Sequence, residues 1–201
     1  MELNMSVFLH VGCGPTTKKD LKGFNSDEWN EIRFDIDEKV APDIVGTLTD
    51  MSSVESSSVD AIYSSHNIEH IYSHEIQKAL NEFHRVLKPE GIAVVTCPDL
   101  QSVCEAVAMG KLLEPLYVSQ AGPVSAIDIL YGHRASLAAG NDYMSHKCGF
   151  TFPALSDSFI AAGFKSTFGG RRPAAFDIWL VAFKGEVTEE EMKRISSIYL
   201  P

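Results

Sequence analysis

The sequence has few cysteines, no long apolar run and no leader segment. Its 201 residues include four cysteines but no C-x-x-C pair, so neither a zinc site nor secretion is indicated. The sequence does not begin with a basic stretch followed by an apolar one, as a signal peptide would. A membrane span requires about 20 apolar residues, and no apolar run approaches that length. We therefore expect reduced thiols, a cytoplasmic location and no insertion into a membrane. The cysteines are Cys13, Cys97, Cys104 and Cys148.

Basic residues are scarce relative to acidic ones. The chain has 17 Lys and Arg against 27 Asp and Glu, which gives a formal net charge of -10. A polyanion would meet net repulsion, so we expect no nucleic-acid partner. Arg171 and Arg172 form one local basic pair. This pair fits either a site for a phosphate or carboxylate or a solvated turn beside Gly and Pro.

Length and composition indicate one folded domain over residues 1–201. Hydrophobic residues make up 45% of the chain and charged residues 22%, which is the ordinary mix of a globular protein. A chain of this length can bury a substantial core but is short for two complete domains.

The first half of the chain alternates strand patterns with helix-length segments. Apolar periodicity over residues 73–87 predicts a helix with Ser73 as its N-cap, followed by a turn at residues 88–91. A weaker pattern predicts a helix within residues 18–30. Such alternation predicts parallel strands joined by right-handed crossovers. The predicted strands are residues 7–11, 32–36, 44–45, 59–64 and 92–97.

The last third of the chain has a different pattern. A helix containing Leu155 and Phe159 is followed by strands at residues 164–168 and 176–183, and their short linker predicts an antiparallel hairpin. Thr188 and Glu191 form a capping box that begins a carboxyl-terminal helix. We therefore predict an α/β fold: a doubly wound, mostly parallel seven-stranded sheet with helices on both faces and a terminal antiparallel hairpin.

Three segments carry a resemblance to a known family. These are LHVGCGP at residues 9–15, DAIYSSHNIEH at residues 60–70 and EFHRVLKPEG at residues 82–91. Together with the order of the elements, they resemble class I S-adenosylmethionine-dependent methyltransferases of the small UbiE-like type. The resemblance implies S-adenosylmethionine as cofactor and transfer of its methyl group to a small-molecule acceptor.

The glycine turn after the first strand is the first candidate cofactor site. Gly12, Cys13 and Gly14 permit a sharp bend and a close approach of the backbone to a ligand. Asp35, at the end of the second strand, can accept hydrogen bonds from both ribose hydroxyls. Asp37 competes for this role, but alternation along a strand turns it to the other face.

Two further cofactor contacts follow from the resemblance. It implies an adenine contact in the loop after the third strand, commonly an acid followed by a backbone amide. The sequence departs from that pattern at Thr47, so the contact falls to the Leu48 backbone or to Asp50. His66 ends the fourth strand, where the class places residues that face the sulfonium. It is either a general base or a residue that shapes the pocket.

Residues 111–147 form a long insertion at the expected strand-end face. Long loops in that place often carry specificity, so we expect a lid over the acceptor site. Tyr131 and His133 are its candidate catalytic residues, and His146 is a third chemically capable residue. Structural roles are expected for Glu69 and His70. The histidines in and after the fourth strand show no spacing that specifies a metal site, so no metal is assigned.

Two other functions remain open on the sequence alone. A dinucleotide-dependent oxidoreductase would use the same turn and acid, but Thr17 replaces the third glycine of its motif. A non-catalytic cofactor-binding or regulatory domain is the other alternative. A homodimer is also an alternative if the insertion alone does not cover the acceptor site.

Overall fold

The computed structural model describes residues 5–119 and 121–201, in which seven strands form one sheet of order β3-β2-β1-β4-β5-β9-β8. β9 runs antiparallel to both β5 and β8, and the other neighbouring strands are parallel, which confirms the predicted fold. The strands are β1 Ser6–Val11, β2 Trp29–Asp35, β3 Ile44–Val45, β4 Val59–Ser65, β5 Leu87–Pro98, β8 Ser166–Arg172 and β9 Asp177–Phe183.

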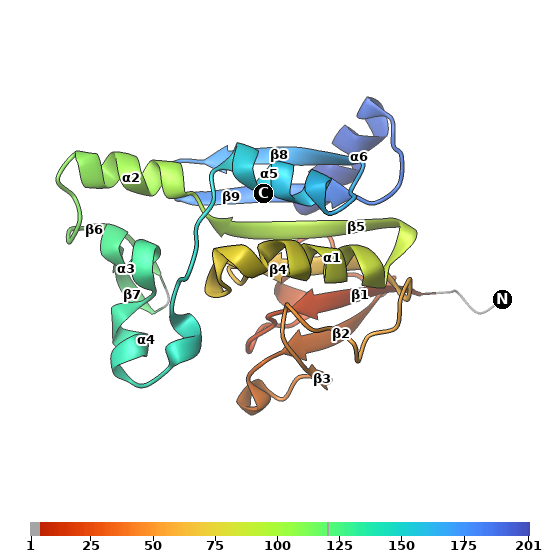
Figure 1. The fold of residues 1–201 in the computed structure, drawn as a ribbon, viewed down its shortest axis with the longest axis horizontal. Coiled ribbons are helices and arrows are strands. Elements are labelled where there is room, and N and C mark those ends of the chain that lie inside the picture. Colours follow the sequence, from red (N-terminus) through yellow and green to blue (C-terminus); the bar gives the residue numbers. More distant parts are fainter. Residues whose placement is uncertain (1–4, 120) are drawn as a thin grey trace.

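Helices cover both faces of the sheet. In Figure 1, α1 and α5 lie across one face, and α6 lies behind the other. Within the described residues no helix is long and apolar enough to cross a membrane. The helices are α1 Ile76–Val86, α2 Leu100–Ala108, α3 Ala126–Tyr131, α4 Arg134–Ala138, α5 Phe152–Ala161 and α6 Glu189–Tyr199. The short 3₁₀ helices are η1 Lys18–Asp20, η2 Glu38–Val40, η3 Ile68–His70, η4 Ser73–Glu75 and η5 Asp142–Met144.

Alternation along the strands divides the core into two clusters. Successive side chains of a strand point to opposite faces, and in β1 Leu9 joins the larger cluster while Phe8 joins the smaller one. The larger cluster receives Phe83 from α1 and Phe159 from α5. The smaller cluster receives Tyr199 from α6, so this helix docks on the domain as its apolar stripe predicts.

The helix predicted within residues 18–30 is wrong. Only the short η1 forms there, followed by turns. Gly23 adopts φ +83°, and a Cβ at this position would lie 2.5 Å from the Tyr199 ring. Leu21 and Phe24 are buried against the sheet although no helix forms around them. The docking of α6 therefore replaces the packing that a helix would have supplied.

Two smaller predictions also need correction. The turn expected at residues 88–91 is an irregularity inside β5, because Val59 pairs with Leu87 whereas Ala61 already pairs with Ile92. Ser73 does not cap α1. It lies in η4, where the backbone N–H of Tyr72 donates to the Glu75 carboxylate at 3.2 Å.

The insertion folds beyond the carboxyl ends of the parallel strands. It contains β6 Pro115–Ser119 and β7 Gly122–Ser125, which pair as an antiparallel hairpin, together with α3, α4 and η5. In Figure 1 these elements lie to the left, at the end to which β1 and β5 point. Ligands of doubly wound sheets bind at this end, so the insertion lies where an acceptor site is expected.

Candidate active site

The glycine turn and Asp35 converge. Gly12 and Gly14 both have positive φ, at +67° and +50°. The backbone N–H of Gly14 donates to the Asp35 carboxylate at 2.8 Å. A Cβ on Gly12 would lie 2.3 Å from the Asn67 side chain, whereas one on Gly14 would meet no heavy atom within 4 Å. The turn is therefore closed on the Asn67 side and open in front of Gly14.

The neighbouring side chains have other partners. The Asp37 carboxylate accepts the backbone N–H of Lys39 at 3.0 Å, which starts η2. The Cys13 side chain is buried, and burial raises the pKa of its thiol to about 11. Near neutral pH Cys13 therefore stays a thiol. Its backbone N–H donates to the carbonyl oxygen of Phe34 at 3.3 Å, and its carbonyl oxygen accepts the backbone N–H of Thr16 at 3.1 Å.

The two candidate adenine residues lie in different environments. Leu48 is buried in the larger core cluster. Asp50 is exposed, accepts the backbone N–H of Ser52 at 3.1 Å, and lines a surface depression with Lys78 and Arg85 of the α1 side. Hydrogen bonds from Ser52 lower the pKa of Asp50. Among the described residues no hydrogen bond links Asp50 to the glycine turn.

His66 closes β4 in an unusual backbone conformation. Its φ is +49°, and its backbone N–H donates to the carbonyl oxygen of Thr96 at 2.8 Å. The side chain is 49% exposed, with Nδ1 3.5 Å from Oε1 of Glu69. Burial lowers the pKa of His66, but the Glu69 carboxylate outweighs it and raises the pKa. Because half of the side chain meets solvent, screening weakens this effect.

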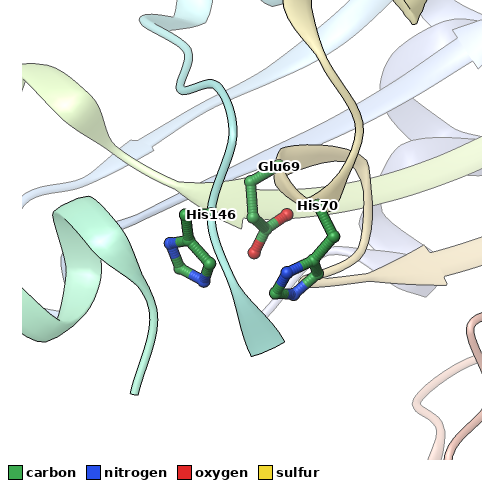
Figure 2. Close-up of side chains that lie close together, drawn as sticks. All are labelled: Glu69, His70 and His146. Atoms are coloured by element: carbon green, nitrogen blue, oxygen red, sulfur yellow. The ribbon is translucent and has the colours of Figure 1, made fainter. Parts of the chain in front are cut away.

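Glu69, His70 and His146 form a cluster that local sequence spacing does not reveal. One ligand-capable atom of each residue lies within 4.8 Å of the others. Figure 2 shows the Glu69 carboxylate between the two imidazole rings. Burial raises the pKa of Glu69, but the nearby His66 and the two clustered histidines outweigh it and lower the pKa. The sequence signal for this cluster was His146 at the end of the insertion, which the fold brings next to η3.

The segment after the insertion is hydrogen-bonded to this cluster. The backbone N–H groups of Lys147 and Cys148 donate to the carbonyl oxygen of Glu69 at 2.8 and 3.2 Å. The backbone N–H of His146 donates to the carbonyl oxygen of Tyr131 at 3.2 Å. The insertion is therefore tied to the end of β4 through backbone contacts.

A cavity of about 170 Å³ lies between α2, α3 and this segment. Tyr131, which is 65% exposed, and His146 both border it. His133 is not among its lining residues, and its Nδ1 lies 2.8 Å from Oγ of Ser136 within α4. The lining residues are Pro98, Leu100, Val103, Ile129, Leu130, Tyr131, His146, Lys147, Cys148 and Gly149.

The turn predicted for the basic pair is wrong, because Arg171 and Arg172 lie in β8. Nε of Arg171 lies 2.7 Å from the fully buried Asp99 carboxylate, and Arg172 pairs with Asp177. These carboxylates are partners within the chain, and binding of an external phosphate or carboxylate by the pair stays a prediction.

Comparisons with known proteins give one family match. Residues 9–95 match the family described as "Methyltransferase domain". This segment includes the glycine turn, Asp35, His66 and Glu69. No curated protein matches the chain.

Solved structures share the fold at low sequence identity. The PH0226 protein from Pyrococcus horikoshii is 14% identical, with a TM-score of 0.59. The alignment spans 90% of this chain and 84% of the PH0226 chain. The Burkholderia thailandensis 1,6-didemethyltoxoflavin-N1-methyltransferase, solved with S-adenosylhomocysteine, is 14% identical with a TM-score of 0.54, over 90% of this chain and 72% of the other. An O-methyltransferase family protein from Burkholderia thailandensis is 8% identical, with a TM-score of 0.56. The alignment spans 94% of this chain and 54% of the other. Against several other matches this chain spans 48% to 62% of their length.

Proposed function

We propose that this chain is a class I S-adenosylmethionine-dependent methyltransferase that transfers the methyl group of this cofactor to a small-molecule acceptor. The match of residues 9–95 to a methyltransferase-domain family and the strand order of the sheet support the proposal. The observation that carries the proposal is the 2.8 Å contact between the Gly14 backbone and the Asp35 carboxylate at the carboxyl end of the sheet. The small UbiE-like type remains a prediction from the sequence.

The residues present fit the cofactor. Asp35 uses one oxygen for the N–H of Gly14 and the other for the N–H of Asp37, at 2.8 and 2.9 Å. An ionised carboxylate offers about four lone-pair positions, so two remain for the ribose hydroxyls. The open space in front of Gly14 admits a ligand to the backbone. We assign the adenine contact to the Leu48 backbone, because the Asp50 side chain faces α1.

The chain's own residues mainly position the reactants. The bound cofactor supplies a sulfonium that activates the methyl group and leaves as a neutral thioether. Alignment of the acceptor with that methyl group supplies much of the acceleration. We propose that Tyr131 contacts the acceptor in the cavity beside α3. His66 takes up the acceptor's proton where one must leave.

Calorimetry with S-adenosylhomocysteine tests the cofactor site. Asp35→Ala is expected to weaken binding about tenfold or more, since a hydrogen bond to a charged group contributes about 1.5–3 kcal/mol. Asp37→Ala is the matched control, because its carboxylate serves η2, and its affinity should equal that of the natural protein. Equal losses in both variants, or none in either, would contradict the assignment.

Two further measurements separate the alternative functions. Binding of NAD in the same titration would favour an oxidoreductase. Cofactor binding without methylation of any member of a small-molecule acceptor panel would favour a regulatory domain. We propose that radiolabelled methyl from S-adenosylmethionine appears in an acceptor of the panel.

The cellular setting and the assembly state are also proposals. The four cysteines are free, which supports a reducing, cytoplasmic setting. The net charge of -10 supports a partner other than nucleic acid. Sedimentation at micromolar concentration distinguishes a monomer from a homodimer in which a second subunit helps to cover the acceptor.

A further inference from the structure

Glu69 is a buried carboxylate without a hydrogen bond to either oxygen. Its side chain is 1% exposed, and both carboxylate oxygens lack a hydrogen-bond partner among the described residues. The His66 ring, at 3.5 Å, is its nearest ion-pair partner. Burying a carboxylate in this way is costly unless a cation or donors compensate it. A cation bound at this carboxylate would supply the missing compensation.

The two clustered imidazoles are arranged as metal ligands commonly are. Nδ1 of His70 lies 3.1 Å from the carbonyl oxygen of Ser145, and Nδ1 of His146 lies 2.7 Å from that of Ile129. A carbonyl oxygen only accepts hydrogen bonds, so each Nδ1 carries the proton. In a neutral ring the lone pair is then on Nε2. Metal-binding histidines typically donate their second ring N–H to a carbonyl or carboxylate in this way.

We propose that Glu69, His70 and His146 bind a divalent transition metal ion. Imidazole and carboxylate ligands together suit ions such as Zn²⁺, Fe²⁺ and Co²⁺, and two histidines with one carboxylate leave coordination positions open. The three ligand atoms lie within 4.8 Å of one another. Three ligands with bonds of about 2.0–2.2 Å in tetrahedral or trigonal geometry lie about 3.3–3.8 Å apart. The side chains therefore need to approach one another by up to about 1.5 Å.

The position of the cluster indicates what the ion does. His146 belongs both to the cluster and to the wall of the 170 Å³ cavity. An ion on this ring lies at the edge of the cavity, where an open coordination position can take an oxygen atom of the acceptor. This assignment rests on the proposed function. The acceptor's hydroxyl loses its proton to His66, the oxygen bonds to the methyl carbon, and the carbon–sulfur bond breaks with its electron pair staying on sulfur.

Zinc calorimetry on untagged, metal-stripped protein tests the site. The natural protein should bind one Zn²⁺ per chain. Glu69→Gln and His146→Gln should weaken binding by more than about 100-fold, because loss of even an outer partner of a ligand costs about 10–100-fold. His74→Gln is the matched control: this histidine is exposed and outside the cluster, so its affinity should be unchanged.

Two additional measurements keep the result interpretable. Circular dichroism checks that each variant is folded, and Zn²⁺ should raise the Tm of the natural protein but not of Glu69→Gln. If Glu69→Gln does not fold, His146→Gln gives the same test with a partly exposed residue. Absence of Zn²⁺ binding to the natural protein, or equal affinity in all variants, overturns the metal site.

Failure of the metal site and failure of the proposed function are distinguishable. Binding of S-adenosylhomocysteine without Zn²⁺ binding would overturn the metal site and leave methyl transfer standing. Binding of Zn²⁺ without S-adenosylhomocysteine would leave the metal site and contradict methyl transfer. If both bind, methylation of acceptors that carry a hydroxyl should fall after chelation and return with Zn²⁺.

Discussion

The sheet and the insertion are stabilised in different ways. The sheet lies between two large apolar clusters whose central side chains, such as Phe83 and Phe8, are fully buried. Among the described residues the insertion contributes three buried side chains, Val124, Ala126 and Ile129, to a small cluster with α2, and its partly buried Leu116 and Leu130 pack against them. Regions with few buried apolar contacts open at lower free energy than a core. The fold therefore provides a rigid sheet and an insertion that opens more easily.

Polar contacts supply much of what holds the insertion together. The buried carboxylate of Asp128 accepts hydrogen bonds from the Ser125 backbone and hydroxyl at 2.9 and 2.6 Å, and from the Arg134 guanidinium at 2.7 Å. Where the insertion ends, the backbone N–H groups of Lys147 and Cys148 donate to the carbonyl oxygen of Glu69 in η3. Each of these contacts depends on the positions of a few polar atoms and not on a large buried apolar area. We therefore expect single substitutions to loosen the insertion without unfolding the sheet.

The largest effect is expected in the core under α1. Phe83→Ala should lower the free energy of unfolding by about 3–5 kcal/mol, because a fully buried phenylalanine is replaced by a cavity. Urea denaturation followed by circular dichroism measures this loss. Ile129→Ala, in the small cluster, is the comparison and should lower the free energy of unfolding by about 2 kcal/mol, the lower end of the range for an isoleucine truncation. An equal loss in both variants would show that the insertion unfolds together with the sheet.

A backbone substitution in the insertion should have the next largest effect. Gly132 has φ +104°, and a Cβ there would lie 2.1 Å from the carbonyl oxygen of Met144. Gly132→Ala should destabilise the insertion by about 1–3 kcal/mol, seen as faster hydrogen exchange over residues 126–148. Gly140→Ala is the control, since its φ is also positive but a Cβ there meets nothing within 4 Å. Similar exchange in both variants would exclude the steric contact as the cause.

Removal of the Asp128 charge should open the insertion at a smaller cost. Asp128→Asn should destabilise it by about 1–2 kcal/mol, through weaker capping and a lost charge-assisted hydrogen bond. The Arg134 guanidinium holds the pKa of Asp128 well below its ordinary range. The carboxylate therefore stabilises the fold above the unfolded pKa of about 3.9, and this contribution declines as pH falls toward the folded pKa.

Hydrogen exchange also checks the pH dependence of this contact. Below about pH 4, the natural protein should open at residues 126–148 before the sheet, and Asp128→Asn should lack this step. Identical acid profiles for the two proteins would count against the role assigned to Asp128.

The smallest effect is expected at the cap of α6, on the sheet side. The Thr188 hydroxyl accepts the backbone N–H of Glu191 at 3.2 Å. Thr188→Ala should lower the free energy of unfolding by about 1 kcal/mol, measured by urea denaturation. Exchange in the insertion should stay unchanged, because α6 packs on the opposite part of the molecule from the small cluster. Ser197→Ala, at an exposed site in the same helix, is the control with no expected loss.

Local patterns predicted most of the sheet. Strand segments carry period-two or continuous apolar runs. The short linker between β8 and β9 leaves no room for a crossover helix, so the reversed strand follows from the length of that linker alone. The glycine turn and Asp35 were also predictable, because the turn directly follows β1 and Asp35 is the last residue of β2. The helix expected after β1 failed because α6, from the other end of the chain, covers that part of the sheet.

By itself the sequence determined the class of fold, the glycine turn and the place of the insertion, since these depend on neighbours along the chain. Only the tertiary structure decided the partners of residues far apart in sequence. It pairs Arg171 with Asp99, and it brings His146 to Glu69 and His70. The physical reason is that ion pairs and side-chain clusters depend on distances in space, and spacing along the chain determines those distances only within one helix, strand or turn.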